Sequence, residues 1–498
     1  MKKMNLWKKI VITALSVCML VPSVPAAADS TVPYDSYNYD YWEDIKFTPA
    51  PYIPDRSVSG TTLGVGTLVN PQDLCVSPNG SIYIADTGNH RILEVDASLS
   101  KTVRVIDSFD RDGTQEKFNS PYGVCVSKNG QIYIADSENH RIVVLEESDL
   151  SFVRIIENPT SDVLEENFVF TPLKVTVDYA DRVYSIAKGM FQGIMVFEGE
   201  GEFTGFFGTI EVNITTWEKI WRKLSTKAQR SKQVLFIPTE FTGIDIDADG
   251  FVYASNIDQN GIQAVRRLNP KGEDVIKKGE NLNVGGDLQT VSLSMSDYGG
   301  VSTIVDVVYR GKGIYSLLDS RRGRIFTYDH EGNLLYIFGG LGTQAGTFTT
   351  PVAIEAVGDK IIVLDANRRE LLVFKETQYG DLINRAVALR YDDDETLAVD
   401  LWKQVLMLDE NNELANVGIG KAYLTAGDNE SAMKYLKLGM SRKYYSVAYR
   451  RYRNDFLKKY LGFILTGIVL LTAAVVLVNR HIKKKKGVYE EEGGAFDV

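Results

Sequence analysis

Residues 71–96 return almost unchanged at residues 121–146, and this repetition constrains the fold more than any other feature of the chain. Both copies begin with Pro and continue through Cys-Val-Ser, Asn-Gly and Ile-Tyr-Ile-Ala-Asp to Asn-His-Arg-Ile. The offset between the copies is 50 residues throughout. Repeats of about 20 to 50 residues are typical of architectures in which each unit buries its apolar face by stacking on its neighbours.

Each copy predicts three short strands, which in the first copy cover residues 74–76, 82–85 and 92–95. The Asn-Gly pair between the first two strands suits a tight hairpin turn. Strand, turn, strand, turn, strand is the pattern of one β-propeller blade. Weaker copies follow and begin near Phe170, Pro238, Ile304 and Phe348. The chain is therefore predicted to be mainly β, with six blades.

The Asn-His-Arg-Ile box at residues 89–92 and 139–142 resembles that of the NHL repeat. The resemblance implies a six-bladed NHL β-propeller, which we expect over residues 46–378. Residues 46–62 resemble an extended strand ahead of the first copy. We expect this strand to pair into the last blade and close the ring, because closure removes exposed sheet edges.

The N-terminus predicts export from the cytoplasm. Residues 1–28 combine an early group of lysines, an apolar run and small residues ending at Ala28, which is typical of a secretory signal peptide. A lipoprotein signal would instead use Cys18, but Val17 stands where such a signal has a small residue. Residues 29–45 are expected to form a tyrosine-rich linker.

The C-terminus predicts a membrane anchor. Residues 461–478 are 18 uncharged, mostly apolar residues, long enough for a transmembrane helix. A long domain that follows an export signal is translocated largely regardless of its charge. We therefore expect a single-pass protein of the cell membrane, with an extracytoplasmic propeller and a cytoplasmic tail over residues 479–498. The formal net charge of −10 gives no electrostatic reason to expect nucleic acid as a partner.

Residues 379–460 are predicted to be helical. Their apolar pattern returns after 34 residues, which is the period of tetratricopeptide repeats. The segment resembles two such repeats, forming a neck in which residues 441–460 run on into the membrane. Repeats of this family present a groove to peptides or helices, so Trp402 and Tyr423 are candidates for partner contact. The alternative is that the neck is only a stiff spacer.

An insertion over residues 209–237 interrupts the repeats. A capping box at Thr215 opens a predicted helix that carries tryptophans on one face and basic residues elsewhere. Such a helix either docks on a membrane or a partner, or packs its tryptophan face on the propeller. The candidate contact residues are Trp217, Lys219, Trp221, Arg222 and Lys223.

The polar residues of the two repeat boxes are predicted to be structural. We expect them to hold loops and neighbouring blades together; they are Asp86, Asn89, His90, Arg91, Asp136, Asn139, His140 and Arg141. Cys75 and Cys125 occupy equivalent places on adjacent blades, either as a disulfide or as two small buried side chains.

Two classes of function follow from this organisation. The first is a membrane-anchored binding or scaffold protein that recognises a protein, peptide or glycan through its propeller and neck, such as an accessory of a membrane transport complex. The second rests on resemblance to six-bladed lactonases and lyases, and is a metal-dependent hydrolase or lyase with its site at the central channel. No catalytic, metal or cofactor residue can be assigned from the sequence, and a binding role is preferred.

Overall fold

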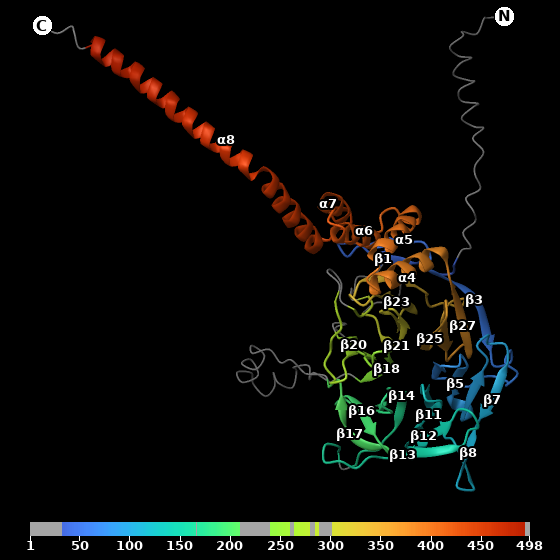
Figure 1. The fold of residues 1–498 in the computed structure, drawn as a ribbon. Coiled ribbons are helices and arrows are strands. Elements are labelled where there is room, and N and C mark those ends of the chain that lie inside the picture. Colours follow the sequence, from blue (N-terminus) through green and yellow to red (C-terminus); the bar gives the residue numbers. More distant parts are fainter. Residues whose placement is uncertain are drawn as a thin grey trace, which may run out of the picture.

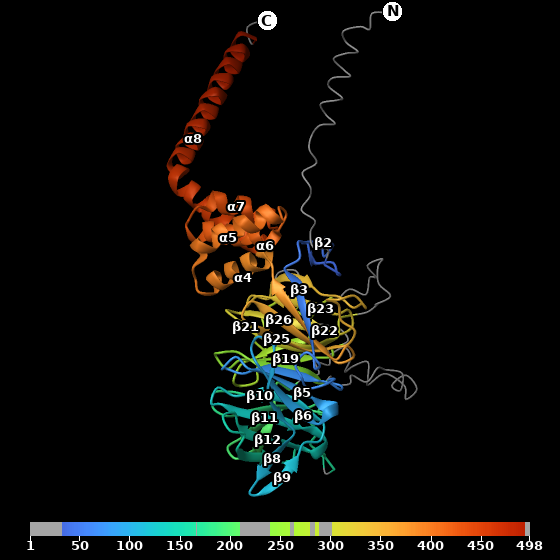
Figure 2. The ribbon, with the colours of Figure 1, turned by 90° about the vertical axis from the view of Figure 1, so that its right-hand side faces the viewer.

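The computed structural model describes residues 32–165, 167–209, 240–258, 263–278, 284–287 and 301–493. These residues form a ring of sheets with a cluster of helices at one edge, from which a long helix projects (Figures 1 and 2). The expected signal peptide, with Cys18, lies outside the described residues. So do the candidates of the insertion, which are Trp217, Lys219, Trp221, Arg222 and Lys223.

Six antiparallel sheets make up the ring, so the predicted six-bladed propeller is confirmed. The first three blades contain β4 (Asp73–Val76), β5 (Ile82–Asp86), β6 (Arg91–Val95) and β7 (Thr102–Ile106); β10 (Pro121–Val126), β11 (Gln131–Asp136), β12 (Arg141–Glu146) and β13 (Phe152–Ile156); and β14 (Pro172–Val177), β15 (Val183–Ala187), β16 (Ile194–Glu198) and β17 (Glu202–Phe207). A separate hairpin, β8 (Ser108–Arg111) and β9 (Thr114–Lys117), connects blades 1 and 2.

The other three blades continue the same order. They contain β18 (Phe241–Ile246), β19 (Val252–Asn256) and β20 (Val265–Leu268); β21 (Ile304–Gly311), β22 (Ile314–Asp319), β23 (Arg324–Tyr328) and β24 (Leu334–Phe338); and β25 (Pro351–Val357), β26 (Lys360–Asp365) and β27 (Glu370–Glu376). The fourth blade, whose repeat is weakest in the sequence, shows three strands among the described residues.

The first long strand of the chain closes the ring. β3 (Tyr52–Ser59) pairs antiparallel with β27, from Ser59 opposite Glu370 to Tyr52 opposite Glu376. The last blade is therefore built from both ends of the propeller, and the predicted closure is confirmed. Tyr52 is fully buried, and its hydroxyl donates to Glu376 at 3.0 Å.

Repeated tyrosines show why the blades stack. Tyr83, Tyr133, Tyr184 and Tyr253 stand at the same register position on the second strand of blades 1 to 4, and each is almost completely buried. Each tyrosine side chain packs in an apolar core formed with a neighbouring blade. Burial of one large apolar side chain contributes about 1.5–3 kcal/mol, so the ring is stabilised by contacts between blades.

Part of the segment expected to be a linker is a strand. β1 (Tyr37–Tyr39) and β2 (Ile45–Phe47) form a hairpin that extends the blade 5 sheet beyond β24. The hydroxyls of Tyr37 and Tyr39 both donate to Asp287, the former at 2.8 Å. The prediction of a linker over 29–45 is therefore wrong for residues 37–39 and 45, which lie in strands because the tyrosine side chains reach a sheet edge and a buried acceptor.

The neck is helical, as predicted. They are α4 (Gln378–Tyr391), α5 (Glu395–Leu408), α6 (Glu413–Thr425), α7 (Asn429–Leu438) and the start of α8 (Arg442–Gly493). Side chains at Thr377, Asp394, Asn412 and Asp428 accept hydrogen bonds from the first turns of α4 to α7. Such N-caps stabilise a helix by about 1 kcal/mol each.

The neck packs against the rim of blades 5 and 6 and not over the centre of the ring (Figures 1 and 2). Tyr379, Leu382 and Ile383 of α4 belong to the same apolar core as Tyr336 and Phe374 of the propeller. α8 then leaves the neck and includes the predicted span, and it is long and apolar enough to cross a membrane.

Candidate functional site

The innermost strands place two layers of side chains at the centre of the ring. Alternate residues of a strand point to the same side, so equivalent register positions form a layer. The first layer contains Asp73, Gly123, Lys174, Gly243, Asp306 and Ala353. The second layer contains Cys75, Cys125, Thr176, Asp245, Val308 and Glu355.

Lys174 joins three blades across the first layer. Its ammonium group donates to Asp73 of blade 1 and lies 3.7 Å from Asp306 of blade 5. The backbone N–H of Val124 donates to Asp73 at 3.0 Å, and that of Ile354 donates to Asp306 at 3.0 Å. All three charged side chains are buried, and both carboxylates are therefore held by a cation and a backbone donor.

Glycine makes room for this arrangement. A Cβ atom at Gly243 would lie 2.4 Å from a carboxylate oxygen of Asp306. A Cβ atom at Gly123 would lie 2.4 Å from the carbonyl oxygen of Leu173, next to Lys174. The first layer thus alternates charged residues with residues that are small enough to admit them.

The buried carboxyl groups of both layers hold protons more tightly than usual. Burial raises the pKa of Asp306 to about 7, against the opposing effect of Lys174. Burial also raises the pKa of Asp245 to about 6, and it raises that of Glu355 well above its usual range. Burial lowers the pKa of Lys174, but Asp306 and Asp73 more than offset this, so its net pKa lies above the ordinary value.

We expect the Asp245 carboxyl to make stability depend on pH. Its pKa is about 6 in the folded protein and about 3.9 when unfolded, so the native state binds the proton more tightly between these values. The stabilisation is fully present below about pH 4 and is lost as the pH rises through about 6. As the pH falls from 7.5 to 4.5, the free energy of unfolding of wild type should rise by about 2 kcal/mol relative to that of Asp245→Asn. Chemical denaturation at the two pH values measures this difference. The exposed control Asp359→Asn should follow wild type, and an Asp245→Asn curve parallel to wild type would contradict the raised pKa.

The cysteines of the second layer are free thiols in this structure. The neighbouring Cys125 thiol, together with burial, raises the pKa of Cys75 well above its ordinary value. The Cys125 sulfur also lies 3.9 Å from the hydroxyl of Thr176. The sequence left open a disulfide or two unbonded cysteines, and the structure has the two cysteines unbonded.

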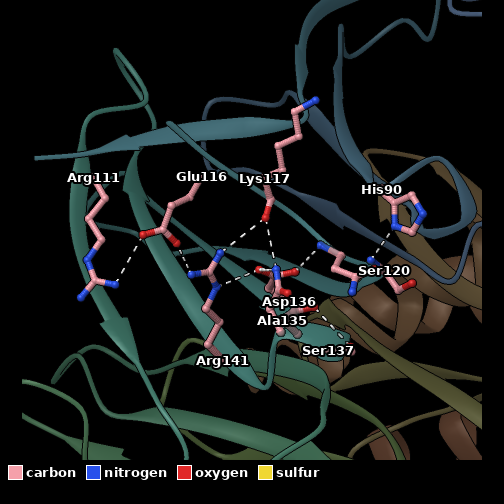
Figure 3. A network of polar contacts seen from close by, with 11 residues as sticks. His90, Arg111, Glu116, Lys117, Ser120, Ala135, Asp136, Ser137 and Arg141 are labelled. Carbon is pink, nitrogen blue, oxygen red and sulfur yellow. Dashed lines mark hydrogen bonds and ion pairs between the residues drawn. The ribbon is translucent and has the colours of Figure 1, made fainter. Parts of the chain in front are cut away.

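Each repeat box is built around a buried aspartate. Asp86 accepts hydrogen bonds from the side chains of Asn89 and Arg91, both at 2.8 Å, and from the backbone N–H of Val69. In the second copy, Asp136 accepts in the same way from Asn139, Arg141 and the N–H of Asn119 (Figure 3); these three distances are 2.8, 2.9 and 2.7 Å. The aspartates therefore tie the loop that precedes a blade to that blade's outer strands.

The two box histidines link neighbouring blades. His90 and His140 each adopt a left-handed backbone conformation at the end of a short 3-10 turn. The His90 Nδ1 atom accepts from the N–H of Ser120, which leads into blade 2 (Figure 3). The His140 Nδ1 atom lies 3.1 Å from the carbonyl oxygen of Phe170, which leads into blade 3. These contacts serve blade architecture.

Asp136→Ala is expected to cost about 3 kcal/mol of stability. The substitution removes the acceptor shared by Nε of Arg141, the Asn139 amide and the backbone N–H of Asn119. Arg141 keeps its pairing with Glu116 and the Asn139 amide keeps the carbonyl oxygen of Lys117, so the backbone N–H and the Arg141 Nε atom lose most. Urea denaturation measures the loss, and Glu138→Ala, on the same turn but exposed, provides the control. Equal stability of the two variants would show that the box aspartate is dispensable.

A charged cluster fastens the neck to blade 5. Glu331, in the loop after β23, accepts from Arg390 of α4 and Lys421 of α6, each at 2.7 Å. Burial would raise the pKa of Glu331, but Lys421 and Arg390 reverse this and lower it to about 2. Next to it, the ring of His330 packs edge-on against Tyr391 at a centroid distance of 5.2 Å. The neck and the propeller are thus joined by ion pairs as well as by a shared apolar core.

A cavity of about 470 Å³ lies beside this cluster. The β1–β2 hairpin, the loop at residues 331–334, α6 and the turn between α7 and α8 surround it. Its wall carries both signs of charge: the lysines are Lys46, Lys277, Lys278, Lys421 and Lys443, and the acids are Asp40, Glu331, Asp409 and Glu413. We call this cavity the junction pocket.

An exposed tryptophan and a half-buried tyrosine stand on the hairpin that borders the junction pocket. Trp42 is 67% exposed and packs edge-on against Tyr41 at 5.0 Å between ring centroids. The guanidinium of Arg442, at the start of α8, lies 5.2 Å from the centre of the Tyr41 ring. Neither the pocket nor these rings could be placed from the sequence, because they depend on the docking of residues 32–47 beside the neck.

The neck candidates differ from what was expected. Trp402 is fully buried, and a Cβ atom on Gly418 would lie 2.4 Å from its indole nitrogen. Its proposed place on an interaction surface is wrong, because α6 covers the ring. Tyr423 is half-buried and stacks on Tyr435 at 5.6 Å, between α6 and α7.

This chain shares little sequence with the known proteins that it resembles. Among curated proteins, no sequence shows significant similarity to this chain. Solved structures similar to it include virginiamycin B lyase from Staphylococcus aureus, at 12% identity and a TM-score of 0.39, over 63% of this chain and 97% of that one. Hydrazine synthase of Kuenenia stuttgartiensis matches at 12% identity and a TM-score of 0.38, over 68% and 95%. The Swd1 β-propeller domain from Myceliophteria thermophila matches at 8% identity and a TM-score of 0.37, over 66% and 100%.

A sequence-family comparison addresses the repeat itself. The NHL repeat matches residues 68–94 and 118–145, which correspond to blades 1 and 2 and their boxes. Together with the six sheets of the ring, this match shows that the chain contains NHL repeats within a six-bladed β-propeller.

Proposed function

We propose that this protein is a membrane-anchored, extracytoplasmic binding protein, which recognises a protein, peptide or glycan where its propeller meets its neck. The observation that carries the proposal is the junction pocket, which combines five lysines and four acids with the exposed Trp42 on the hairpin beside it. Mixed charge beside a rigid aromatic ring suits recognition of a polar macromolecule. The neck helices supply one wall, in keeping with the tetratricopeptide-like role expected from their 34-residue period.

The centre of the ring favours this role over metal-dependent catalysis. A metal ion in this layer would be bound by converging carboxylates such as those of Asp73 and Asp306. Lys174 already supplies the cation for both of them. Among the described residues, no group of three or more His, Cys, Asp or Glu side chains is arranged to hold a metal ion. An internal ion pair of this kind makes the layer a structural brace between blades.

The proposed anchoring is tested by labelling experiments that show which side of the membrane each end of the protein faces. A membrane-impermeant maleimide should label Lys101→Cys, on the propeller surface, in intact cells. The same reagent should label Lys485→Cys, near the end of α8, only after permeabilisation. Labelling of both sites in intact cells, or of Lys485→Cys alone, would contradict the proposed orientation.

The proposed binding role is tested by co-purification of crosslinked complexes from native membranes. Lys277→Glu with Lys443→Glu reverses two charges on the wall of the junction pocket. We expect this variant to lose at least about 90% of the recovered partner while melting like wild type, since both side chains are exposed. Lys101→Glu with Lys117→Glu is the matched control, at exposed positions on blade 1 and on the hairpin after it. Equal recovery from the two variants would exclude the junction pocket as the binding surface.

A further inference from the structure

The exposed part of α8 carries a continuous stripe of aromatic side chains. Tyr449, Tyr452, Phe456 and Tyr460 are 50%, 38%, 46% and 38% exposed. Their spacing of three and four residues puts them on one face of the helix. Phe456 and Tyr460 are in ring contact, with centroids 4.8 Å apart. We call these four residues the aromatic stripe.

A different face of α8 packs on the neck. Ala448 is fully buried against α6 and α7, Arg451 donates to the carbonyl oxygen of Leu424 at 3.1 Å, and Asp455 accepts from Asn429 at 3.0 Å. Each of these three residues is one position before a member of the stripe, a rotation of about 100° around the helix. The aromatic stripe is therefore not required to attach α8 to the neck.

The stripe runs on into the candidate membrane span. Phe463, Gly467 and Leu470 continue the spacing on the same face, and Phe463 is 78% exposed. A glycine on a helix face within a membrane lets a second helix approach closely. One face of α8 thus presents a single seam from the end of the neck into the apolar segment, along the helix that projects from the neck in Figure 1.

Positive charge flanks the seam. Helical spacing places Arg453 on one side of the aromatic stripe and Lys459 on the other, each within about 70° of its centre. In paired helices, charges beside an apolar seam select the partner. A second copy of this chain would set these cations against each other, whereas acidic residues would pair with them.

We propose that the aromatic stripe docks a helix of a partner membrane protein, and that this helix carries acidic residues beside an apolar seam where it leaves the membrane. The inference rests on the proposed membrane anchoring and names the class of partner that the anchored protein would join. The seam spans about 16 Å outside the membrane, from residue 449 to residue 460, and so matches about three helical turns of a partner.

The test uses designed single-span peptides with an apolar seam, reconstituted with the full-length protein in zwitterionic bilayers. One peptide carries glutamates beside its extramembrane seam and the other carries lysines. Energy transfer between labelled protein and peptide reports association. We expect the glutamate peptide to associate at least about tenfold more tightly than the lysine peptide, and Arg453→Glu with Lys459→Glu should reverse this preference.

Two variants separate the stripe from charge in general. Tyr452→Ser with Phe456→Ser should abolish association with the glutamate peptide. Lys458→Glu changes a cation on the opposite side of the helix from the stripe and should have little effect, unlike Lys459→Glu beside it.

Each remaining outcome counts against the proposal in its own way. Equal association with both peptides would overturn it, as would tighter association between two copies of the protein than with either peptide. A spin label at residue 452 found at headgroup depth in anionic vesicles would instead assign the stripe to a lipid surface. Failure of the protein to withstand alkaline extraction from the bilayer would overturn the anchoring itself, and the partner class with it.

Discussion

Deletion of residues 48–60 should lower the melting temperature by at least about 15 °C or abolish folding. These residues contain β3, whose pairing with β27 supplies the outer strand of blade 6. Without it, β27 becomes an exposed edge, and the buried Tyr52 and Val58 are lost from two cores. The measurement is thermal unfolding of a fragment of residues 32–441, which lacks the candidate membrane span, followed by circular dichroism.

Deletion of residues 32–47 is the matched control for this experiment. It removes a segment of similar length, including the β1–β2 hairpin, but leaves the ring closed by β3. We expect a smaller decrease, because the deletion leaves all six blades with their own strands, although it removes the buried Tyr34 and Tyr37 from the cores around blade 5. A larger loss from the control than from the removal of β3 would contradict closure as the source of stability.

Lys174→Met should destabilise the propeller by about 3–5 kcal/mol at pH 8. The substitution leaves Asp73 and Asp306 buried in one layer without their shared cation. Urea denaturation should show a smaller loss at pH 5, because Asp306, with a pKa of about 7, is then protonated and needs no partner. Lys128→Met, at an exposed turn, should change stability by less than about 1 kcal/mol.

A combined variant identifies the cause of this loss. Adding Asp73→Asn and Asp306→Asn to Lys174→Met removes both unpaired charges at nearly constant volume. We expect most of the lost stability to return, as it does when a buried ionic group is replaced as a whole. No recovery would indicate that Lys174 acts through packing of its aliphatic chain and not through its charge.

The fold could be predicted from the sequence because blade formation is local. Asn79-Gly80 and Asn129-Gly130 define hairpins, and the 50-residue period then stacks one blade on the next. Ring closure was predicted because residues 46–62 form one more extended segment, and the sequence offers no other strand for it to pair with. The helical character of residues 379–460 was also predicted, but not the helix boundaries, which the structure places at side chains that cap each first turn.

The centre of the ring was missed although the sequence contained a signal. Asp73, Lys174 and Asp306 all occupy the same repeat position, where the other copies have Gly or Ala. Charged residues on an inner strand that is otherwise apolar predict a buried network once the copies are aligned. That alignment identifies the layer, but the pairing of blades 1, 3 and 5 through one lysine depends on the three-dimensional ring.

The junction pocket could not be predicted from the sequence. Glu331 meets Lys421 across 90 residues, and Tyr37 meets Asp287 across 250. No local pattern specifies such contacts, and a tyrosine-rich segment next to a predicted export signal resembles a linker. The burial of Trp402 was likewise decided by the close approach of α6 at Gly418.

Native mass spectrometry of the full-length protein, extracted gently from its own membrane, tests the central claim most directly. The account predicts a complex with an additional protein or glycan mass, which disappears in Lys277→Glu with Lys443→Glu and persists in Lys101→Glu with Lys117→Glu. Recovery of the wild-type protein alone, with one divalent metal ion bound in each copy, would contradict a binding role and favour a catalytic centre in the ring.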